Sequence, residues 1–201
     1  MATVTRARTK LDLDPGEVEA TLLPVERATM LPPRAFVDPG VLEWEIENVF
    51  GGWTCMGHAS AIAEPGDYLT REIGPSGVFA MRGAGGEPRA FLNVCRHRGA
   101  RLLTESEGSV RRRIQCPYHS WSYDLDGSLV AAPHMDEVED FDRSCNGLIE
   151  VRSAVVGGLL LIDLSGVARD PEEHVGDLAP MLERYRLEDL RLARGVFYDV
   201  E

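Results

Sequence analysis

The chain has 201 residues, of which 44% are hydrophobic, and a formal net charge of −12 at pH 7. This length is enough for one domain with its own core and attached arms. The acidic balance disfavours general binding to nucleic acid or to anionic membranes, so neither is expected as a partner. The longest apolar run, Val155 to Ile162, contains two glycines and is far too short to span a bilayer. Four scattered cysteines and the lack of a secretory signal predict a reducing, cytoplasmic location.

The N-terminal part of the chain predicts an arm followed by one helix. Residues 1–35 are polar, are punctuated by prolines and lack regular periodicity. The helix is expected from Asp38, because Asp38 can cap it and Pro39 suits its first turn. Its apolar positions repeat at helical spacing, so the helix is expected to lay this stripe on a core. The stripe consists of Leu42, Ile46, Val49 and Phe50.

Between Trp53 and Ile162 the pattern changes to short apolar or alternating runs that are split by turn residues. The expected strands are Tyr68–Ile73, Val78–Arg82, Ala90–Val94, Arg113–Gln115, Trp121–Tyr123 and Leu159–Ile162. The expected turns are Gly74–Gly77, Gly85–Pro88 and Asp126–Gly127. Such a series is typical of antiparallel hairpins, so the fold class is mainly β. Short helical turns are expected to follow from Asp170 to about Tyr185, and residues 194–201 begin another strand-like run.

Two short motifs carry the chemistry. In NVCRHRG, Cys95 and His97 stand one residue apart, and in QCPYHSW, Cys116 and His119 stand two residues apart. Each motif follows a predicted strand, so two hairpin tips would present four metal ligands from neighbouring directions. A structural zinc site uses the same residue types, although zinc fingers place the two cysteines in one pair and the two histidines in the other. The remaining alternative is two buried cysteines beside incidental histidines.

The sequence CRHRG, followed by CPYHSW and DLDG, resembles the Rieske motif. The resemblance implies a Rieske-type [2Fe–2S] cluster as cofactor, in which Cys95 and Cys116 would hold one iron while His97 and His119 hold the second. The implied fold is a Rieske-type antiparallel β domain with an N-terminal helical arm and short C-terminal helices. With neutral imidazoles the charges of the irons, sulfides and thiolates cancel, so the cluster would accept an electron more readily than one held by four thiolates.

Other residues near the motifs have expected supporting roles. Gly99 and Pro117 would shape tight loops whose backbone amides point at sulfur, and Trp121 would cover the cluster against water. Nearby arginines form either a solvated face or a basic patch that steers an acidic electron donor. These arginines are Arg96, Arg98, Arg101, Arg111, Arg112 and Arg113. Structural or surface positions are expected for His58, His134 and His174, and buried or free thiols for Cys55 and Cys145.

The resemblance extends beyond the cluster motifs, over most of residues 30–135. The stretch from LPPRAFVDPG to GGWTCMGH is similar to the N-terminal arm of Rieske non-haem iron oxygenase α subunits, and PGDYLT and FLNVCRHRGARL continue the similarity. The cluster motifs are nearest to the branch that acts on aromatic rings and quaternary ammonium compounds. The resemblance implies an arm and helix at residues 1–52 and a Rieske domain at 53–165. Residues 166–201 would form a connection that leads towards a catalytic domain absent from this chain.

The function that this resemblance implies is electron transfer within an oxygenase that hydroxylates or N-demethylates a small organic substrate with O2. Its partners would be a ferredoxin or flavin reductase and, at full length, further copies in a homo-oligomer, a trimer. Such enzymes hold mononuclear Fe(II) with two histidines and a carboxylate in a second domain. Only His134 and His174 follow residue 119, so this chain is expected to lack that site and to carry no catalytic residue. The alternative is a stand-alone Rieske ferredoxin-type electron carrier.

Overall fold

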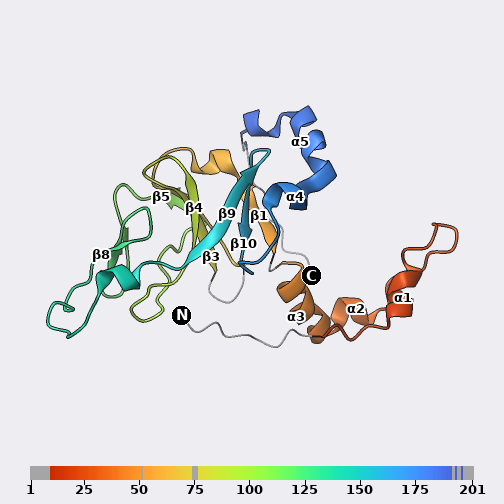
Figure 1. Cartoon of the computed structure of the whole chain (residues 1–201), viewed down its shortest axis with the longest axis horizontal. Coiled ribbons are helices and arrows are strands. Elements are labelled where there is room, and N and C mark those ends of the chain that lie inside the picture. Colours follow the sequence, from red (N-terminus) through yellow and green to blue (C-terminus); the bar gives the residue numbers. More distant parts are fainter. Residues whose placement is uncertain (1–9, 51, 74–76, 192, 194–195, 197–201) are drawn as a thin grey trace. The chain divides into compact units, whose positions relative to one another are not determined.

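The computed structural model describes residues 10–50, 52–73, 77–191, 193 and 196. The chain divides into two compact units, one ending at Gly52 and the other beginning at Trp53 (Figure 1). In the described part of the chain, no helix is long and apolar enough to cross a membrane. Apart from Val196, the strand-like run expected at 194–201 lies outside the described residues.

The N-terminal unit is helical, in three short pieces. These are α1 (Pro15–Ala20), α2 (Arg34–Val37) and α3 (Pro39–Asn48). Asp38 caps α3 as expected, because its Oδ1 accepts the backbone N–H of Gly40 at 2.8 Å. The expected helical arm is confirmed, although the residues of the arm lack regular apolar periodicity. Asp14 caps α1 in the same way, with Pro15 in the first turn, so a local capping sequence forms a helix without apolar periodicity.

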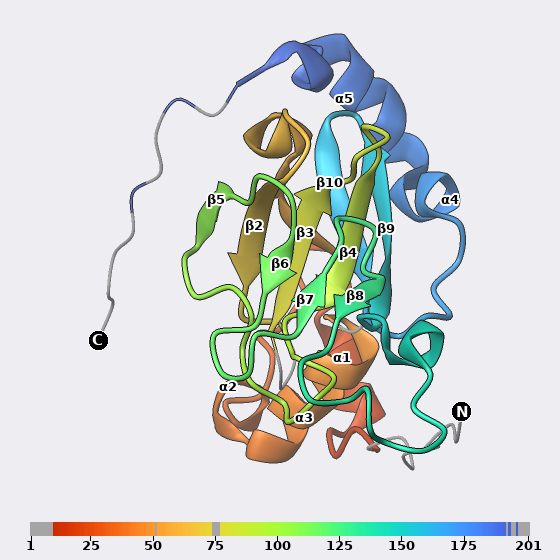
Figure 2. The ribbon, with the colours of Figure 1, turned by 90° about the vertical axis from the view of Figure 1, so that its left-hand side faces the viewer.

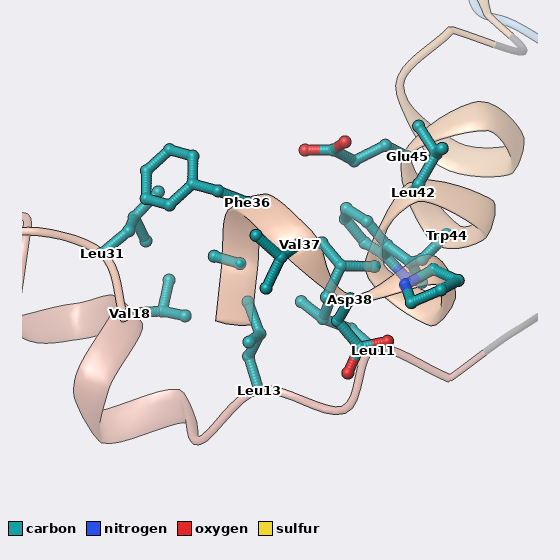
Figure 3. A pocket seen from close by; sticks show the side chains of 13 residues that line it. Leu11, Leu13, Val18, Leu31, Phe36, Val37, Asp38, Leu42, Trp44 and Glu45 are labelled. Atoms are coloured by element: carbon teal, nitrogen blue, oxygen red, sulfur yellow. The ribbon is translucent and has the colours of Figure 1, made fainter. Parts of the chain in front are cut away.

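The expected apolar stripe of α3 does not lie on a core. Its four residues remain between 47% and 54% exposed, whereas the neighbouring Val41 is 4% exposed. Within this unit the arm segments and the first turns of α3 line a hollow of about 590 Å³, with Val18, Leu31 and Phe36 among its lining residues (Figure 3). The stripe prediction was wrong because the described residues of this unit offer the stripe no packed core: of its four residues only Leu42 lines the hollow, and it stays 54% exposed.

The second unit is built on two antiparallel sheets, which confirms the expected fold class (Figures 1 and 2). The larger sheet has the order β1-β10-β9-β4-β3-β2-β5 and the smaller one the order β6-β7-β8. The strands of the larger sheet are β1 (Trp53–His58), β2 (Asp67–Arg71), β3 (Val78–Arg82), β4 (Pro88–Leu92), β5 (Glu107–Ser109), β9 (Glu150–Val156) and β10 (Leu159–Asp163). Those of the smaller sheet are β6 (Ile114–Gln115), β7 (Ser122–Tyr123) and β8 (Leu129–Ala131). Strands β1, β5, β8 and β9 were not predicted.

The smaller sheet lies against one face of the larger sheet, and one core fills the space between them (Figure 2). Aromatic residues from both layers meet there, among them Phe79, Phe91 and Tyr123. Cys95 and Cys116 belong to the same packed cluster. A second core, around Met56, Ile62 and Leu160 among other residues, packs beside β1, β9 and β10. The two cysteine loops therefore stand on a rigid base, since packed interiors resist displacement.

Short helices follow β10 where the sequence predicted helical turns. They are α4 (Pro171–Val175), η3 (Gly176–Leu178), α5 (Ala179–Tyr185) and η4 (Leu187–Asp189), and two further single turns are η1 (Ala59–Ile62) and η2 (Arg143–Asn146). His58 links this segment to β1, because its Nε2 lies 2.8 Å from the carbonyl oxygen of Leu187 while its Nδ1 lies 2.8 Å from the Ser60 hydroxyl. The structural role expected for His58 is therefore confirmed.

Candidate metal centre

The first cysteine loop begins directly after β4 and is closed by two backbone hydrogen bonds. The Cys95 N–H donates to the carbonyl of Ala100 at 2.8 Å, and the Cys95 carbonyl accepts the Gly99 N–H at 3.0 Å. Gly99 adopts a φ of +70°, a left-handed conformation that glycine reaches without strain. The shaping role expected for Gly99 is therefore confirmed. The loop turns back on itself and presents His97 at its tip.

The second cysteine loop repeats this pattern after β6. The Cys116 N–H donates to the carbonyl of Trp121 at 2.8 Å, and the Cys116 carbonyl accepts the Ser120 N–H at 3.1 Å. Ser120, which stands where the first loop has Gly99, also has a positive φ of 60°. The two loops thus share one backbone design, with a left-handed residue four positions after each cysteine, although their histidines stand at different spacings.

Asn93 fixes the first loop to the next segment of chain. Its side chain is 2% exposed; its amide N–H donates to the carbonyl of Leu103 at 2.7 Å. Its Oδ1 accepts the backbone N–H groups of Leu102 at 3.2 Å and Leu103 at 3.0 Å. Burial of a polar amide is costly without such partners. Asn93 belongs to the first sequence motif, but no role was predicted for it. Nothing in the local sequence indicates which backbone groups its side chain would hydrogen-bond.

The four candidate ligands come together at the tips of the two loops. Cys95 and Cys116 are buried, and their thiol groups adjoin each other. His97 and His119 are half-buried, with ring centroids 4.7 Å apart and ring planes inclined by 73°. The Nδ1 atoms of both rings are buried and have no hydrogen-bond partner among the described residues. Two orphaned imidazole nitrogens beside two buried thiols are the donor set that an iron–sulfur cluster of the Rieske type requires.

A zinc ion and a two-iron cluster would need different arrangements of these four ligands. A single tetrahedral zinc would draw all four side chains to one point. Within the described ranges, however, no three His, Cys, Asp or Glu side chains converge in that manner. A [2Fe–2S] cluster of this type takes only two protein ligands on each iron, so its ligands meet as two pairs.

The electrostatic surroundings act differently on the histidine and the cysteine ligands. The pKa of His97 is lowered, mainly by desolvation and then by the nearby His119 and Arg98, so its imidazole is held neutral with a free lone pair. Burial raises the pKa of the Cys95 thiol, and hydrogen bonds from the Tyr123 hydroxyl and the His97 backbone N–H act against that rise. The amide that points at this sulfur thus belongs to His97, whereas the Gly99 amide bonds to a carbonyl.

Trp121 closes one side of the candidate site. Its ring is buried and stacks on the His97 imidazole, with centroids 4.9 Å apart and planes inclined by only 7°. The Phe141 ring packs edge-on against the indole, with centroids 5.6 Å apart. The structure therefore places Trp121 where it limits the access of water to the His97 ring.

Tyr123 is a residue of the site that sequence reasoning missed. It lies on β7 opposite Ile114 of β6, and this register directs its side chain towards the first loop. Its hydroxyl accepts the Arg96 N–H at 3.0 Å and lies 3.2 Å from Cys95 Sγ. Burial, more than its contact with Cys95, raises the pKa of Tyr123 well above the ordinary range, so the hydroxyl stays protonated and can donate to a thiolate.

A Tyr123→Phe variant is expected to keep its cluster but to show a reduction potential lower by roughly 50–100 mV. A hydrogen bond to sulfur stabilises the more negative, reduced state, and a bond to a charged group is worth roughly 1.5–3 kcal/mol, of which part depends on redox state. Voltammetry of the purified protein measures the shift. Tyr185→Phe, which alters an exposed tyrosine on α5, serves as the control and should leave the potential unchanged. Equal potentials for both variants would remove Tyr123 from the site.

Apart from His58, the other cysteines, histidines and arginines considered in the sequence analysis are exposed. Cys55 and Cys145 are exposed and carry free thiols. His134 and His174 are exposed, which agrees with the surface positions expected for them. The arginines of the expected basic patch are all exposed, and Arg101 forms an ion pair with Glu72 at 2.7 Å.

Comparison with known proteins agrees with this geometry. Residues 52–142 match the family model of the Rieske [2Fe-2S] domain. The carnitine monooxygenase oxygenase subunit of Escherichia coli (strain K12) is 38% identical over 171 residues, which cover 84% of this chain and 46% of that protein. The glycine betaine monooxygenase oxygenase subunit of Chromohalobacter salexigens is 37% identical over 164 residues, which cover 81% of this chain and 36% of that protein.

Solved structures show the same relationship. A quaternary ammonium Rieske monooxygenase in complex with L-carnitine superposes with a TM-score of 0.76 at 34% identity, covering 81% of this chain and 47% of that one. Naphthalene 1,2-dioxygenase with bound indole gives a TM-score of 0.63 at 34% identity, covering 69% and 32%. The chain spans half or less of the length of these relatives. It therefore carries a Rieske [2Fe–2S] domain and is related, over most of its own length, to the Rieske-bearing part of Rieske oxygenase subunits.

Proposed function

We propose that Cys95 and Cys116 bind one iron of a [2Fe–2S] cluster, and that His97 and His119 bind the other through Nδ1. The observation that carries this assignment is the pair of buried Nδ1 atoms without hydrogen-bond partners among the described residues, beside two buried thiols. An unpartnered buried nitrogen costs free energy, and coordination to a metal removes that cost. When bound, the cluster supplies reversible one-electron chemistry.

The two histidines would also provide the path for electrons. The Nδ1 atom of each ring is buried while each residue is partly exposed, so we expect the opposite ring edges to face outward. Trp121, which stacks on the His97 ring, and Tyr123, whose hydroxyl lies 3.2 Å from Cys95 Sγ, would shield the inner side of the site from water. An electron would therefore enter and leave at the imidazole edges, where another redox protein can approach closely.

The electron transferred in this way would serve an oxygenase reaction. Relatives of this chain are named as carnitine and glycine betaine monooxygenase oxygenase subunits, and the structure of one quaternary ammonium Rieske monooxygenase has been described for its inter-subunit electron transfer. We infer the same role here: single electrons arrive from a ferredoxin or flavin reductase and pass to an iron site that activates O2. Quaternary ammonium compounds are the favoured substrate class, because the match with such an enzyme covers 81% of this chain, against 69% and 75% for two naphthalene dioxygenases.

Chemical analysis combined with a reductive titration tests this proposal. The purified protein should be reddish-brown and contain about two irons and two acid-labile sulfides per chain, and the cluster should take up about one electron. A colourless protein that holds zinc and no sulfide would overturn the proposal in favour of a zinc-binding module. Assembled cluster without any electron uptake would leave the ligand assignment intact but contradict the electron-transfer role.

A further inference from the structure

Three buried side-chain polar atoms have no hydrogen-bond partner in the part of the chain that the structure describes, and all three lie at the candidate metal centre. They are the Nδ1 atoms of His97 and His119 and the Nε1 atom of Trp121. Buried polar groups in folded proteins are almost always paired. The buried carboxylate of Asp163, for example, accepts the Ser165 N–H at 2.9 Å. The three orphaned atoms therefore indicate one group that satisfies them together.

Trp121 differs from the two histidines in the kind of partner that it needs. A neutral imidazole offers a lone pair to a metal ion, whereas the indole N–H can only donate a hydrogen bond. Trp121 is 3% exposed and its Nε1 atom is buried, so bulk water does not reach the N–H. A buried donor without a partner costs free energy. The indole N–H therefore requires a hydrogen-bond acceptor inside the site.

The side chains that surround the indole do not supply a strong acceptor. The planes of the indole and the His97 imidazole are inclined by only 7°, so the N–H, which lies in the indole plane, runs alongside the imidazole and does not point into its face. The Phe141 ring meets the indole at 66°, but the face of an aromatic ring is only a weak acceptor. The thiols of Cys95 and Cys116 do not bond to Nε1 either, because this atom has no partner among the described residues.

We propose that the Trp121 Nε1–H donates a hydrogen bond to an inorganic sulfide of the cluster, and that this bond raises the reduction potential of the cluster. The inference rests on the proposed function and assigns to Trp121 a role beyond shielding the site from water. Reduction adds one negative charge to the cluster, so the sulfide of the reduced cluster accepts a stronger hydrogen bond than that of the oxidised cluster. The bond therefore stabilises the reduced state more than the oxidised state.

The test replaces Trp121 with 3-benzothienylalanine, in which a sulfur atom takes the place of the indole N–H while the bicyclic ring keeps its shape. With the cluster assembled, the equilibrium constant for one-electron reduction should fall about three- to tenfold, and a tenfold change corresponds to about 59 mV. Voltammetry measures this shift. Hyperfine spectroscopy on the reduced protein after exchange into D2O should show one coupled deuteron fewer than in the wild type.

The same replacement at Trp53 is the matched control. The Trp53 N–H donates to the carbonyl of Arg169 at 2.8 Å, and Trp53 lies on β1 at the edge of the larger sheet. Its replacement should leave the potential and the coupled deuterons unchanged. Trp121→Phe, which also lacks the N–H, is the second variant if the analogue at residue 121 prevents assembly of the cluster, and it should lower the potential in the same direction.

Two results would overturn the hydrogen bond without touching the proposed function. One is an assembled cluster whose potential and coupled deuterons do not change when the Trp121 N–H is removed, which would give the N–H to Phe141 or to a buried water. The other is an equal shift on replacement of Trp53, which would show that the effect does not depend on the candidate site. A wild-type protein that holds no cluster would overturn the proposed function and this inference together.

Discussion

A Cys116→Ala variant is expected to purify without iron, acid-labile sulfide or visible colour. Cys116 is buried at 2% exposure, and the two cysteines outside the site, Cys55 and Cys145, are exposed, so neither is placed to replace its sulfur. Removing it leaves one iron with a single protein ligand, and an incompletely held cluster is lost to solvent. Metal analysis and the visible absorption spectrum measure the loss, which should be complete.

Cys145→Ala supplies the matched control for this loss. Cys145 is also a free cysteine, but it is exposed and lies outside the two loops. This variant should therefore carry the full complement of iron and sulfide. A colourless Cys145→Ala variant beside a coloured Cys116→Ala variant would show that the cluster is held elsewhere in the chain.

The second large effect is expected from His119→Cys, which should lower the reduction potential by roughly 100–300 mV. Replacing a neutral imidazole with a thiolate adds one negative charge to the cluster, so the incoming electron meets more repulsion. Four-thiolate clusters of the plant type lie several hundred millivolts below Rieske clusters, and this substitution makes one of the two ligand changes that separate them. Voltammetry on the assembled variant measures the shift.

The control for this substitution is His174→Cys, which places a thiol at an exposed position on α4. It should leave the potential unchanged. Cysteine is shorter than histidine, so the His119→Cys variant could fail to assemble its cluster. His97→Cys then provides a second trial, and it should shift the potential in the same direction. An unaltered potential in an assembled His119→Cys protein would remove His119 from the ligand set.

Parts of the fold could be predicted because their causes are local. Strand β3 (Val78–Arg82) is almost wholly buried, so its apolar run and flanking glycines were sufficient. Strand β1 has few β-branched residues and carries a bulge between Cys55 and Gly57, which breaks the alternation. Strand β9 is mostly partly buried or exposed and includes polar residues such as Arg152, so its apolar alternation is weak although Asn146 and Gly147 mark a turn ahead of it. These strands form through their partners in the sheet, which their own sequence does not reveal.

The candidate site, too, was predicted where its features are local and missed where they depend on distant segments of the chain. The spacing of the four ligands is a local property of two loops, so the sequence alone predicted them. Tyr123 stands 28 residues from Cys95, and only the β6–β7 register brings its hydroxyl to the sulfur. The role of Asn93 depends on the course of the chain at Leu102 and Leu103. Long-range hydrogen bonds of this kind have no signature in a single sequence.

The most direct test of the ligand assignment is electron–nuclear double resonance on the reduced protein after growth with ¹⁵N-histidine. Coordination by His97 and His119 predicts two strongly coupled histidine nitrogens, and His119→Cys should leave one of them. The coupled nitrogens should be those at Nδ1, which selective ring labelling can identify, because these are the atoms buried without a hydrogen-bond partner among the described residues. A reduced cluster without coupled histidine nitrogen, or with coupling that His119→Cys leaves intact, would contradict the account.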